Sequence, residues 1–550
     1  MEILTRRDFT SVVGTGAAAW SLLRTGISDG GPLPGRGGAG RLLYTSDPSN
    51  IATMQVGRHT KHVPTAEGAR ADPARAEDLV RWVDNLADNG VDIYAQAVYS
   101  QGWSLYFRSP QFEYDARPQH QRFVPMMDAC VTPLEVLIDQ AHKRGMQFLA
   151  KFRMSDGHGG SGQGAKFMLE NRQWWLEEFP GRLDYSFQPV RDYVFNFADE
   201  VVRRFNVDGL MFNYIRWLHC FPREVAQKQQ PIMTGWLERI REMLDRRGAE
   251  KGKKLKLAVM VPLTLQECHL LGYDVPTWVR QGLIDYVCPC DFKYSDFSAP
   301  YDTFAELTRS TNCQLFPSVI PLADGPLLLK PENYRALAQN FYGQGADGVS
   351  VFNFQYHWAR RTGTARYPGP PEGYPAALSV LRDLADPARS AARTREYRYF
   401  PLWFARDANQ SVANRHRVAA SRDESRRLVL QREVGAQGKC QFRACERFST
   451  GTRAVLFVKA QGLQADDEVK IELNGAPIED FQRVFYEKGR LPRFGRELGP
   501  YSTIWCDVTQ PPLTTKDNDL VVELTAPGSG EGEIVIDELQ LVVVPPLGKK

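Results

Sequence analysis

Between residues 41 and 386 the chain alternates short β-rich runs with longer amphipathic runs. Eight β-rich runs can be counted, at 41–46, 91–100, 146–155, 207–217, 255–264, 284–292, 313–322 and 346–355. Helical periodicity lies between them, at 75–89, 132–145, 189–205, 234–247 and 332–343. Parallel strands joined by helical crossovers produce this alternation. The count of eight predicts an α/β fold, a closed (β/α)8 TIM barrel, rather than an open sheet.

The helical run at 132–145 carries its own start and stop signals. Thr132 is suited to cap the helix, Pro133 to begin it, and Glu135 to complete a capping box, while Gly145 ends it. Its apolar residues recur at helical spacing, so one face is expected to pack on the sheet.

After residue 386 the alternation stops and short strands broken by turns follow, for example at 453–463, 468–478, 518–528 and 532–544. This pattern predicts a second, all-β domain. The phrases VKIELNGAPI, TTKDNDLVVELT and IVIDELQLVVV resemble the strands of galactose-binding-like jelly-roll domains of carbohydrate-active enzymes. A structural sandwich covering a barrel face and a sugar-binding module both remain open. The predicted units are a leader (1–40), a barrel (41–390) and a β-sandwich (391–550).

The first 40 residues have the character of an export signal. Arg6 and Arg7 precede Phe9 and an apolar stretch at 12–23, which resembles a twin-arginine signal. The stretch is shorter than the roughly 20 apolar residues of a spanning helix, so we expect cleavage rather than anchoring. The flexible run at 26–40 follows. This predicts a periplasmic or extracellular protein of a bacterium, against the alternative of a buried helix preceded by two arginines.

Composition removes several classes of function. Charged residues make up 24% and the net charge is +3, which argues against nucleic acid and acidic membranes as partners. Nine cysteines at irregular spacing are no disulfide framework, and we expect Cys288 and Cys290, on one face of a strand, to be buried rather than metal ligands. The Gly-rich run at 156–164 lacks the phosphate-loop spacing, no GxSxG elbow stands between a strand and a helix, and the nine histidines are scattered. No cofactor or metal is predicted.

The working groups of such barrels lie at the carboxyl ends of the strands, where the loops converge. These ends are rich in groups that bind sugars, and fewer such groups stand at the strand starts. The predicted substrate-binding residues are Asp47, Tyr99, Trp103, Lys151, Arg153, Asn213, Tyr214, Arg216, Trp217, His219, Asn353, Tyr356, His357 and Trp358. Strand alternation puts Asn213 and Trp217 on one face, and Tyr214 and Arg216 on the other, although a turn at the strand end lets both sets reach the same site.

The segment VDGLMFNYIRW, preceded by PVRDYVFNFADEVVRRFN, resembles the fourth-strand region of the family-10-like glycosyl hydrolases. IDYVCPCDF and GADGVSVFNFQY stand where that family has its sixth and eighth strands. The resemblance implies a (β/α)8 barrel and a polysaccharide or glycoconjugate substrate. It also implies an acid on strand four, at a position that Asn213 occupies here.

Glycoside hydrolysis needs two carboxyl groups, which must then come from other strands. Asp291, at the end of the sixth strand beside Lys293, is the first candidate, and Asp156 and Glu267 follow. Each could instead be a solvated loop carboxylate or a salt-bridge partner. The sequence therefore predicts an exported glycoside hydrolase. The alternatives are a carbohydrate-binding barrel without catalysis, which Asn213 favours, and a polysaccharide lyase or other sugar-modifying enzyme on the same scaffold.

Overall fold

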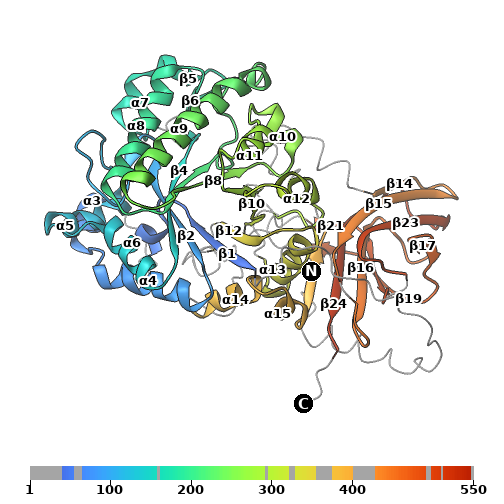
Figure 1. The fold of residues 1–550 in the computed structure, drawn as a ribbon. Coiled ribbons are helices and arrows are strands. Elements are labelled where there is room, and N and C mark those ends of the chain that lie inside the picture. Colours follow the sequence, from blue (N-terminus) through green and yellow to red (C-terminus); the bar gives the residue numbers. More distant parts are fainter. Residues whose placement is uncertain are drawn as a thin grey trace.

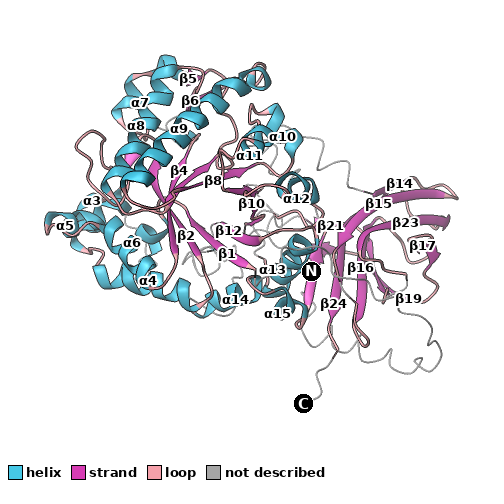
Figure 2. Ribbon diagram, viewed as in Figure 1, coloured by secondary structure: helices cyan, strands magenta, loops and turns pink. Residues whose placement is uncertain are grey.

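The computed structural model describes residues 40–54, 65–157, 162–290, 295–320, 329–352, 354, 375–399, 428–446, 448–490, 497–509 and 512–546. Helices surround a curled parallel sheet in one part of the molecule, and antiparallel strands form the other (Figures 1 and 2). The predicted class, an α/β barrel followed by an all-β region, is confirmed.

The parallel strands close into a barrel. They are β1 (Arg41–Ser46), β2 (Ile93–Ser100), β4 (Gln147–Arg153), β7 (Gly209–Asn213), β8 (Lys256–Val261), β9 (Tyr286–Pro289), β10 (Gln314–Leu315), β11 (Ser318–Val319) and β12 (Gly348–Phe352), paired in the order β10-β9-β8-β7-β4-β2-β1-β12-β11. Only Phe316 and Pro317 separate β10 from β11. These two strands are therefore one predicted strand that pairs with β9 on one side and β12 on the other, which joins the ends of the sheet.

The long helices lie where periodicity predicts them. They are α4 (Ala76–Asp88), α6 (Pro133–Lys143), α8 (Gln188–Arg204), α9 (Gln230–Glu250) and α13 (Pro331–Gly343). Shorter helices are α2 (Asn50–Met54), α3 (Ala66–Ala71), α5 (Val124–Asp128), α7 (Lys166–Glu170), α10 (Leu265–Leu270), α11 (Val275–Arg280), α12 (Asp302–Thr308), α14 (Leu381–Leu384) and α15 (Pro387–Ala391). The predicted capping box of α6 is wrong: Thr132 is the N-cap residue, but its side chain makes no capping hydrogen bond. Pro133 at the first position presets the helical φ without it.

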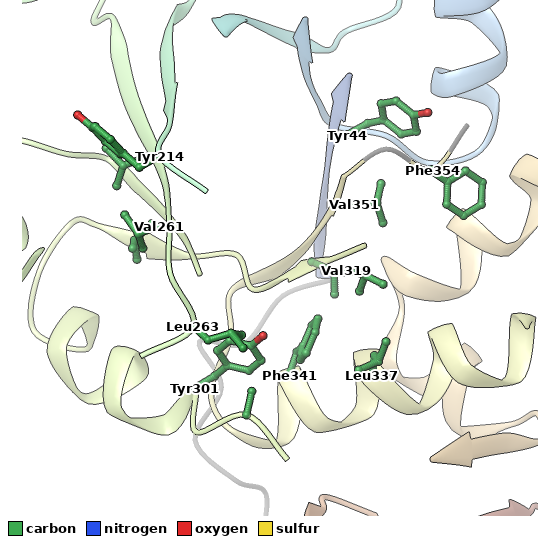
Figure 3. Packing of buried hydrophobic residues seen from close by; sticks show 14 of the residues in the cluster. Tyr44, Tyr214, Val261, Leu263, Tyr301, Val319, Leu337, Phe341, Val351 and Phe354 are labelled. Carbon is green, nitrogen blue, oxygen red and sulfur yellow. The ribbon is translucent and has the colours of Figure 1, made fainter. Parts of the chain in front are cut away.

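Alternate residues of each barrel strand enter two separate apolar clusters. One encloses the barrel interior and takes a residue from every strand or its end, among them Leu43, Ile93, Leu149, Met211, Met260, Cys288, Cys290, Phe316 and Phe352. The other lies between the sheet and the helices, as Figure 3 shows for Val319 beside Leu337 and Phe341 of α13. Cys288 and Cys290 are thus buried in the interior cluster, as predicted.

Four aspartates connect neighbouring barrel strands at their amino ends. Each stands one residue before a strand, and its carboxylate accepts a hydrogen bond from a backbone N–H of the preceding barrel strand at 2.8–3.0 Å. The pairs are Asp92 with Leu42, Asp208 with Phe148, Asp285 with Leu257, and Asp347 with Leu315. The polar groups at the strand starts are thus structural, because these carboxylates satisfy buried backbone donors there.

The close packing of β7 against β8 requires glycine at position 209. A Cβ at this position would lie 2.0 Å from the carbonyl oxygen of Lys256, a backbone atom that cannot rotate away. We expect Gly209→Ala to lower the free energy of unfolding by about 3 kcal/mol or more, measured by urea denaturation. The matched control is Gly282→Ala, where φ is +69° and nothing lies within 4 Å. Its expected cost is about 1 kcal/mol, and equal costs for both variants would contradict the assignment.

The C-terminal strands form two antiparallel sheets. The first has the order β13-β24-β16-β22-β19 with β14 beside β24, and the second has the order β15-β23-β17-β18. Their bounds are β13 (Arg395–Arg398), β14 (Leu428–Leu430), β15 (Ala436–Ala444), β16 (Arg453–Gln461), β17 (Glu468–Leu473), β18 (Ala476–Pro477), β19 (Phe481–Tyr486), β22 (Tyr501–Asp507), β23 (Lys516–Ala526) and β24 (Ile534–Val544). The short strands β20 (Gly489–Arg490) and β21 (Glu497–Leu498) pair with each other.

This β region packs against the barrel helix α13. The Asn340 side chain donates to the carbonyl of Arg443 at 3.0 Å and accepts from the N–H of Cys445 at 2.7 Å. The outer apolar cluster runs through both parts without a break. The two parts therefore share one core, while the domain boundaries, the jelly-roll resemblance and sugar binding by this region stay predictions.

Among the described residues, no helix is both long and apolar enough to cross a membrane. The leader at 1–39 lies outside the described residues, so the twin-arginine signal stays a prediction.

Candidate active site

Arg153 is the centre of a buried charged cluster at the carboxyl ends of the barrel strands, called the mouth below. Its Nε lies 3.9 Å from Oδ1 of Asp47, which follows β1, and its Nη1 lies 3.3 Å from Oδ2 of Asp156, which follows β4. Asp156 also accepts a hydrogen bond of 2.6 Å from the Ser100 hydroxyl at the end of β2. Three neighbouring strands thus hold two carboxylates on either side of one guanidinium.

Lys151 lies one inward-facing position below Arg153 on β4. Its ammonium is 3.8 Å from Oδ1 of Asp47, 3.4 Å from the Thr45 hydroxyl and 4.5 Å from the centre of the Phe352 ring. Burial lowers the pKa of Lys151 to about 7, although the charge of Asp47 opposes the shift. Burial likewise lowers the pKa of Arg153. These cations stand at the edge between the apolar interior and the polar mouth.

Asn213 ends β7 and faces inward, like its neighbours Met211 and Ile215 in the interior cluster. Its Oδ1 accepts from the N–H groups of Ile215 and Arg216 at 3.0 and 3.1 Å. This bond pattern turns the chain out of the strand. As a consequence, Nε of Arg216 reaches to 3.6 Å from Oδ2 of Asp47. Both faces of the predicted strand 207–217 therefore contribute to the mouth because the strand ends at Asn213.

Trp217 lies against two arginines. Its ring is 4.7 Å from the Arg182 guanidinium and 5.6 Å from that of Arg216, which are cation–π distances. A Cβ on Gly157 would come within 3.1 Å of the ring. Arg182 is buried, and burial lowers its pKa to about 10. The half-buried Trp217 is thus held between Arg182 and Arg216, and Arg216 in turn contacts Asp47.

Sequence reasoning missed Arg182. It comes from β6 (Phe179–Leu183), which forms a hairpin with β5 (Trp175–Leu176) between β4 and α8. This hairpin is an insertion and not a barrel strand, so Arg182 is not among the residues predicted from the ends of the barrel strands. The sequence FPGRL shows only a turn-like Pro-Gly pair as a signal.

His219 and Trp103 border the cluster. His219 stacks on Phe179 with ring centres 4.5 Å apart. Trp103, on β3 (Trp103–Ser104), is the antiparallel partner of Ser100, and the Arg117 guanidinium lies 5.7 Å from its ring. Both side chains are almost fully buried. Trp103 thus pairs with the strand residue whose hydroxyl binds Asp156, and His219 stacks on a residue of β6, the strand that carries Arg182.

Two predicted binding residues lie elsewhere. Tyr99 stacks on Phe152 and meets Phe197 of α8, and Tyr214 packs on Tyr273 and Trp278. Both tyrosines are buried between the sheet and the helices. This corrects the prediction that they contact substrate. Strand alternation turns Tyr214 to the outer face, and a register shift between Ala97 and Tyr99 in the pairing of β2 with β4 does so for Tyr99.

Glu267 has a local structural role. It stands in the first turn of α10, where its N–H donates to the Thr264 hydroxyl oxygen and its carboxylate accepts from that hydroxyl, both at 3.1 Å. Thr264 is thus the N-cap residue of α10, and the Glu267 carboxylate binds the capping hydroxyl. The remaining predicted site residues lie outside the described residues, namely Asp291, Asn353, Tyr356, His357 and Trp358. Their roles stay predictions.

The buried imidazole of His219 predicts a specific acid sensitivity. Burial, with the charges of Arg182 and Arg223, lowers its pKa to about 3. Between pH 6.5 and 3 the unfolded chain therefore binds a proton that the folded chain does not, so stability falls on acidification. We expect the loss to reach about 1.4 kcal/mol per pH unit for this group. His219→Gln should flatten the urea-unfolding profile between pH 6.5 and 4, whereas His142→Gln, at a partly exposed ion pair with Asp208, serves as control. Parallel profiles for wild type and His219→Gln would refute this.

Among the described residues, no group of histidine, cysteine and carboxylate side chains could hold a metal ion. No protein-family model matches the chain, and no curated protein matches it.

Solved structures of similar architecture include glycoside hydrolases. The alpha-L-fucosidase isoenzyme 2 from Paenibacillus thiaminolyticus aligns at 15% identity and a TM-score of 0.40, over 65% of this chain and 51% of that one. A GH138 enzyme targeting pectin rhamnogalacturonan II aligns at 11% and 0.38, over 63% and 38%. The alpha-L-fucosidase isoenzyme 1 from the same Paenibacillus aligns at 12% and 0.34, over 88% and 96%. The chain thus spans about half or less of the first two proteins, and the chemistry of the mouth has to be argued from its own residues.

Proposed function

We propose that this protein is an exported glycoside hydrolase that cleaves a polysaccharide or glycoconjugate at the barrel mouth. The observation that carries the proposal is the pair of carboxylates on one guanidinium. Oxygens of Asp47 and Asp156 lie 3.9 and 3.3 Å from nitrogens of Arg153. The two carboxylates are therefore no more than about 10 Å apart, an upper limit that allows the separations of roughly 5–9.5 Å found in glycosidases.

The surroundings of the two carboxylates suggest different roles. Asp47 lies within 4 Å of three cations, Lys151, Arg153 and Arg216. Positive neighbours favour a charged carboxylate, so we assign to Asp47 the role of nucleophile or water-activating base. Asp156 accepts a hydrogen bond from the Ser100 hydroxyl and forms an ion pair with Arg153. It receives the role of proton donor to the leaving oxygen.

Trp217 supports the same function. A half-buried indole next to Arg216, which itself contacts Asp47, offers a flat apolar face, the kind of surface on which a sugar ring packs. The exported character rests on Arg6 and Arg7. Fractionation of bacterial cells making the tagged chain, with both arginines replaced by lysine as comparison, tests it.

Release of reducing sugar from a panel of polysaccharides by the full chain is the test of hydrolysis. Cleavage of at least one polysaccharide is the expected result. Binding without release on the same panel would overturn the proposal in favour of a carbohydrate-binding barrel, the alternative that Asn213 suggests. An unsaturated product that absorbs in the ultraviolet would overturn it in favour of a lyase.

A further inference from the structure

Arg153 and Asn213 are direct neighbours across two parallel strands. They are paired residues in the register of β4 with β7. Neighbouring strands are about 4.8 Å apart, and paired residues point to the same side of the sheet. Leu149 and Met211, an even number of residues before them on their strands, lie in the interior cluster. Both side chains therefore point inward at the mouth.

Each of these two side chains keeps a hydrogen-bond donor unused. Nη2 of Arg153 and Nδ2 of Asn213 are buried and have no hydrogen-bond partner in the part of the chain that the structure describes. The orientation of the amide is fixed, because Oδ1 of Asn213 already accepts two backbone N–H groups. A buried donor without a partner costs about 1–3 kcal/mol. Two such donors side by side are what a bound acceptor would satisfy.

The charge around these donors is positive. Within the described part of the mouth, two carboxylates, Asp47 and Asp156, face four basic side chains, Lys151, Arg153, Arg182 and Arg216. The ammonium of Lys151 has only one hydrogen bond, of 3.4 Å, within the same set of residues. Its contact with Asp47 is longer still. The described part of the mouth therefore holds more basic side chains than carboxylates.

We propose that Arg153 and Asn213 together bind the carboxylate of a uronic acid residue, so that the substrate is an acidic polysaccharide. A carboxylate presents two acceptor oxygens, one for Nη2 and one for Nδ2, and brings a negative charge to the basic side chains of the described part of the mouth. A sugar hydroxyl would supply an acceptor without the charge. This inference rests on the proposed function and names the substrate class of that site.

The proposal also accounts for asparagine at position 213. An aspartate there would accept the same two backbone N–H groups through one oxygen. Its other oxygen would be an acceptor that faces the ligand's carboxylate, so a donor would be replaced by a repulsive charge. The amide keeps the backbone turn and adds the donor.

Calorimetric titration of the full chain tests the proposal. The probes are trisaccharides of galacturonate, glucuronate and mannuronate, trisaccharides of glucose and galactose, and a sulfated galactose trisaccharide. At least one uronate should bind 10-fold or more tightly than both neutral sugars. Asn213→Asp, which preserves shape, should weaken that binding at least 10-fold. Arg153→Lys, which keeps the charge but removes the Nη2 donor, is the second variant if the first fails to fold.

The matched control is Arg241→Met, since Arg241 is also buried and ion-paired, with Asp285 at the amino end of the barrel. Its binding should be unchanged. Equal affinity for neutral and uronate sugars, tight binding of the sulfated sugar alone, or unchanged binding in both mouth variants would each overturn the proposal. Uronate binding without hydrolysis would refute the hydrolase and leave this inference standing. Cleavage of a neutral glycan that is undiminished in Asn213→Asp would support the hydrolase and refute this inference.

Discussion

Replacing Asp156 by asparagine should lower kcat/KM on the cleaved polysaccharide by about 10³-fold, within the range that a general acid contributes. An amide of the same shape cannot donate the proton that the leaving oxygen needs. Asp47→Asn should cause a loss of similar size, because it removes the second carboxylate. The measurement is initial-rate release of reducing sugar, at a temperature where thermal unfolding shows each variant to be folded.

Asp208→Asn is the matched control for both variants. Asp208 is a structural carboxylate at the opposite end of the same barrel, bonded to the N–H of Phe148 and to Lys253 at 2.9 Å. Its replacement should lower stability and leave kcat/KM unchanged. Full activity in both Asp47→Asn and Asp156→Asn would show that the catalytic groups lie elsewhere, with Asp291 as the next residue to replace.

The barrel was accessible to sequence reasoning because two periodicities alternate clearly along the chain. The strand predicted at 41–46 matches β1 (Arg41–Ser46), and the helix predicted at 332–343 starts within one residue of α13. The segment 207–217 was predicted too long. Asn213 binds two following N–H groups and ends the strand there, a side-chain effect that β-propensity does not contain.

The position of site residues was predicted where alternation decides it. Lys151, Arg153 and Asn213 are on inward-facing positions and meet at the mouth, whereas Tyr214 is turned to the helices by the same rule. Tyr99 is turned to the helices by a register shift between Ala97 and Tyr99, which the alternation of the sequence does not show.

Other features had no local signal. Arg182 enters the cluster from a hairpin insertion, which has no fixed place in the barrel repeat. The aspartates before β2, β7, β9 and β12 repeat as an apolar residue followed by Asp, in VDI, VDG, IDY and ADG. Their partners are backbone N–H groups of the neighbouring strand, 28 to 60 residues away. The repeat is visible in the sequence, but its meaning depends on knowing which strands are adjacent.

A second large effect is expected in the C-terminal β region, at Glu446. This buried carboxylate binds the Arg395 guanidinium through two bonds of 2.7 and 2.8 Å, and accepts a third from the Tyr397 hydroxyl at 2.6 Å. Arg395 begins β13 of the first antiparallel sheet, and Glu446 follows β15 of the second. The ion pair therefore connects the two sheets just after the last barrel helices.

Glu446→Ala would leave the Arg395 guanidinium buried without its counter-charge. Breaking a buried pair in this way costs about 3–5 kcal/mol, a large fraction of the 5–15 kcal/mol that stabilises a typical fold. We expect a loss of that size in urea unfolding followed by tryptophan fluorescence. Glu472→Ala, which breaks the more exposed pair with Lys470 on β17, should cost less than about 1 kcal/mol.

The double variant Arg395→Met with Glu446→Leu separates the charge effect from a general loss of packing. Replacing a buried ion pair by apolar side chains of similar volume is often neutral. The double variant should therefore be more stable than Glu446→Ala, although the Tyr397 hydroxyl loses its acceptor. If the double variant is as unstable as Glu446→Ala, the three bonds themselves hold the sheets together, and the cost does not come from an uncompensated charge. A loss below about 1 kcal/mol in Glu446→Ala would show that water reaches Arg395 and that the junction is not closed.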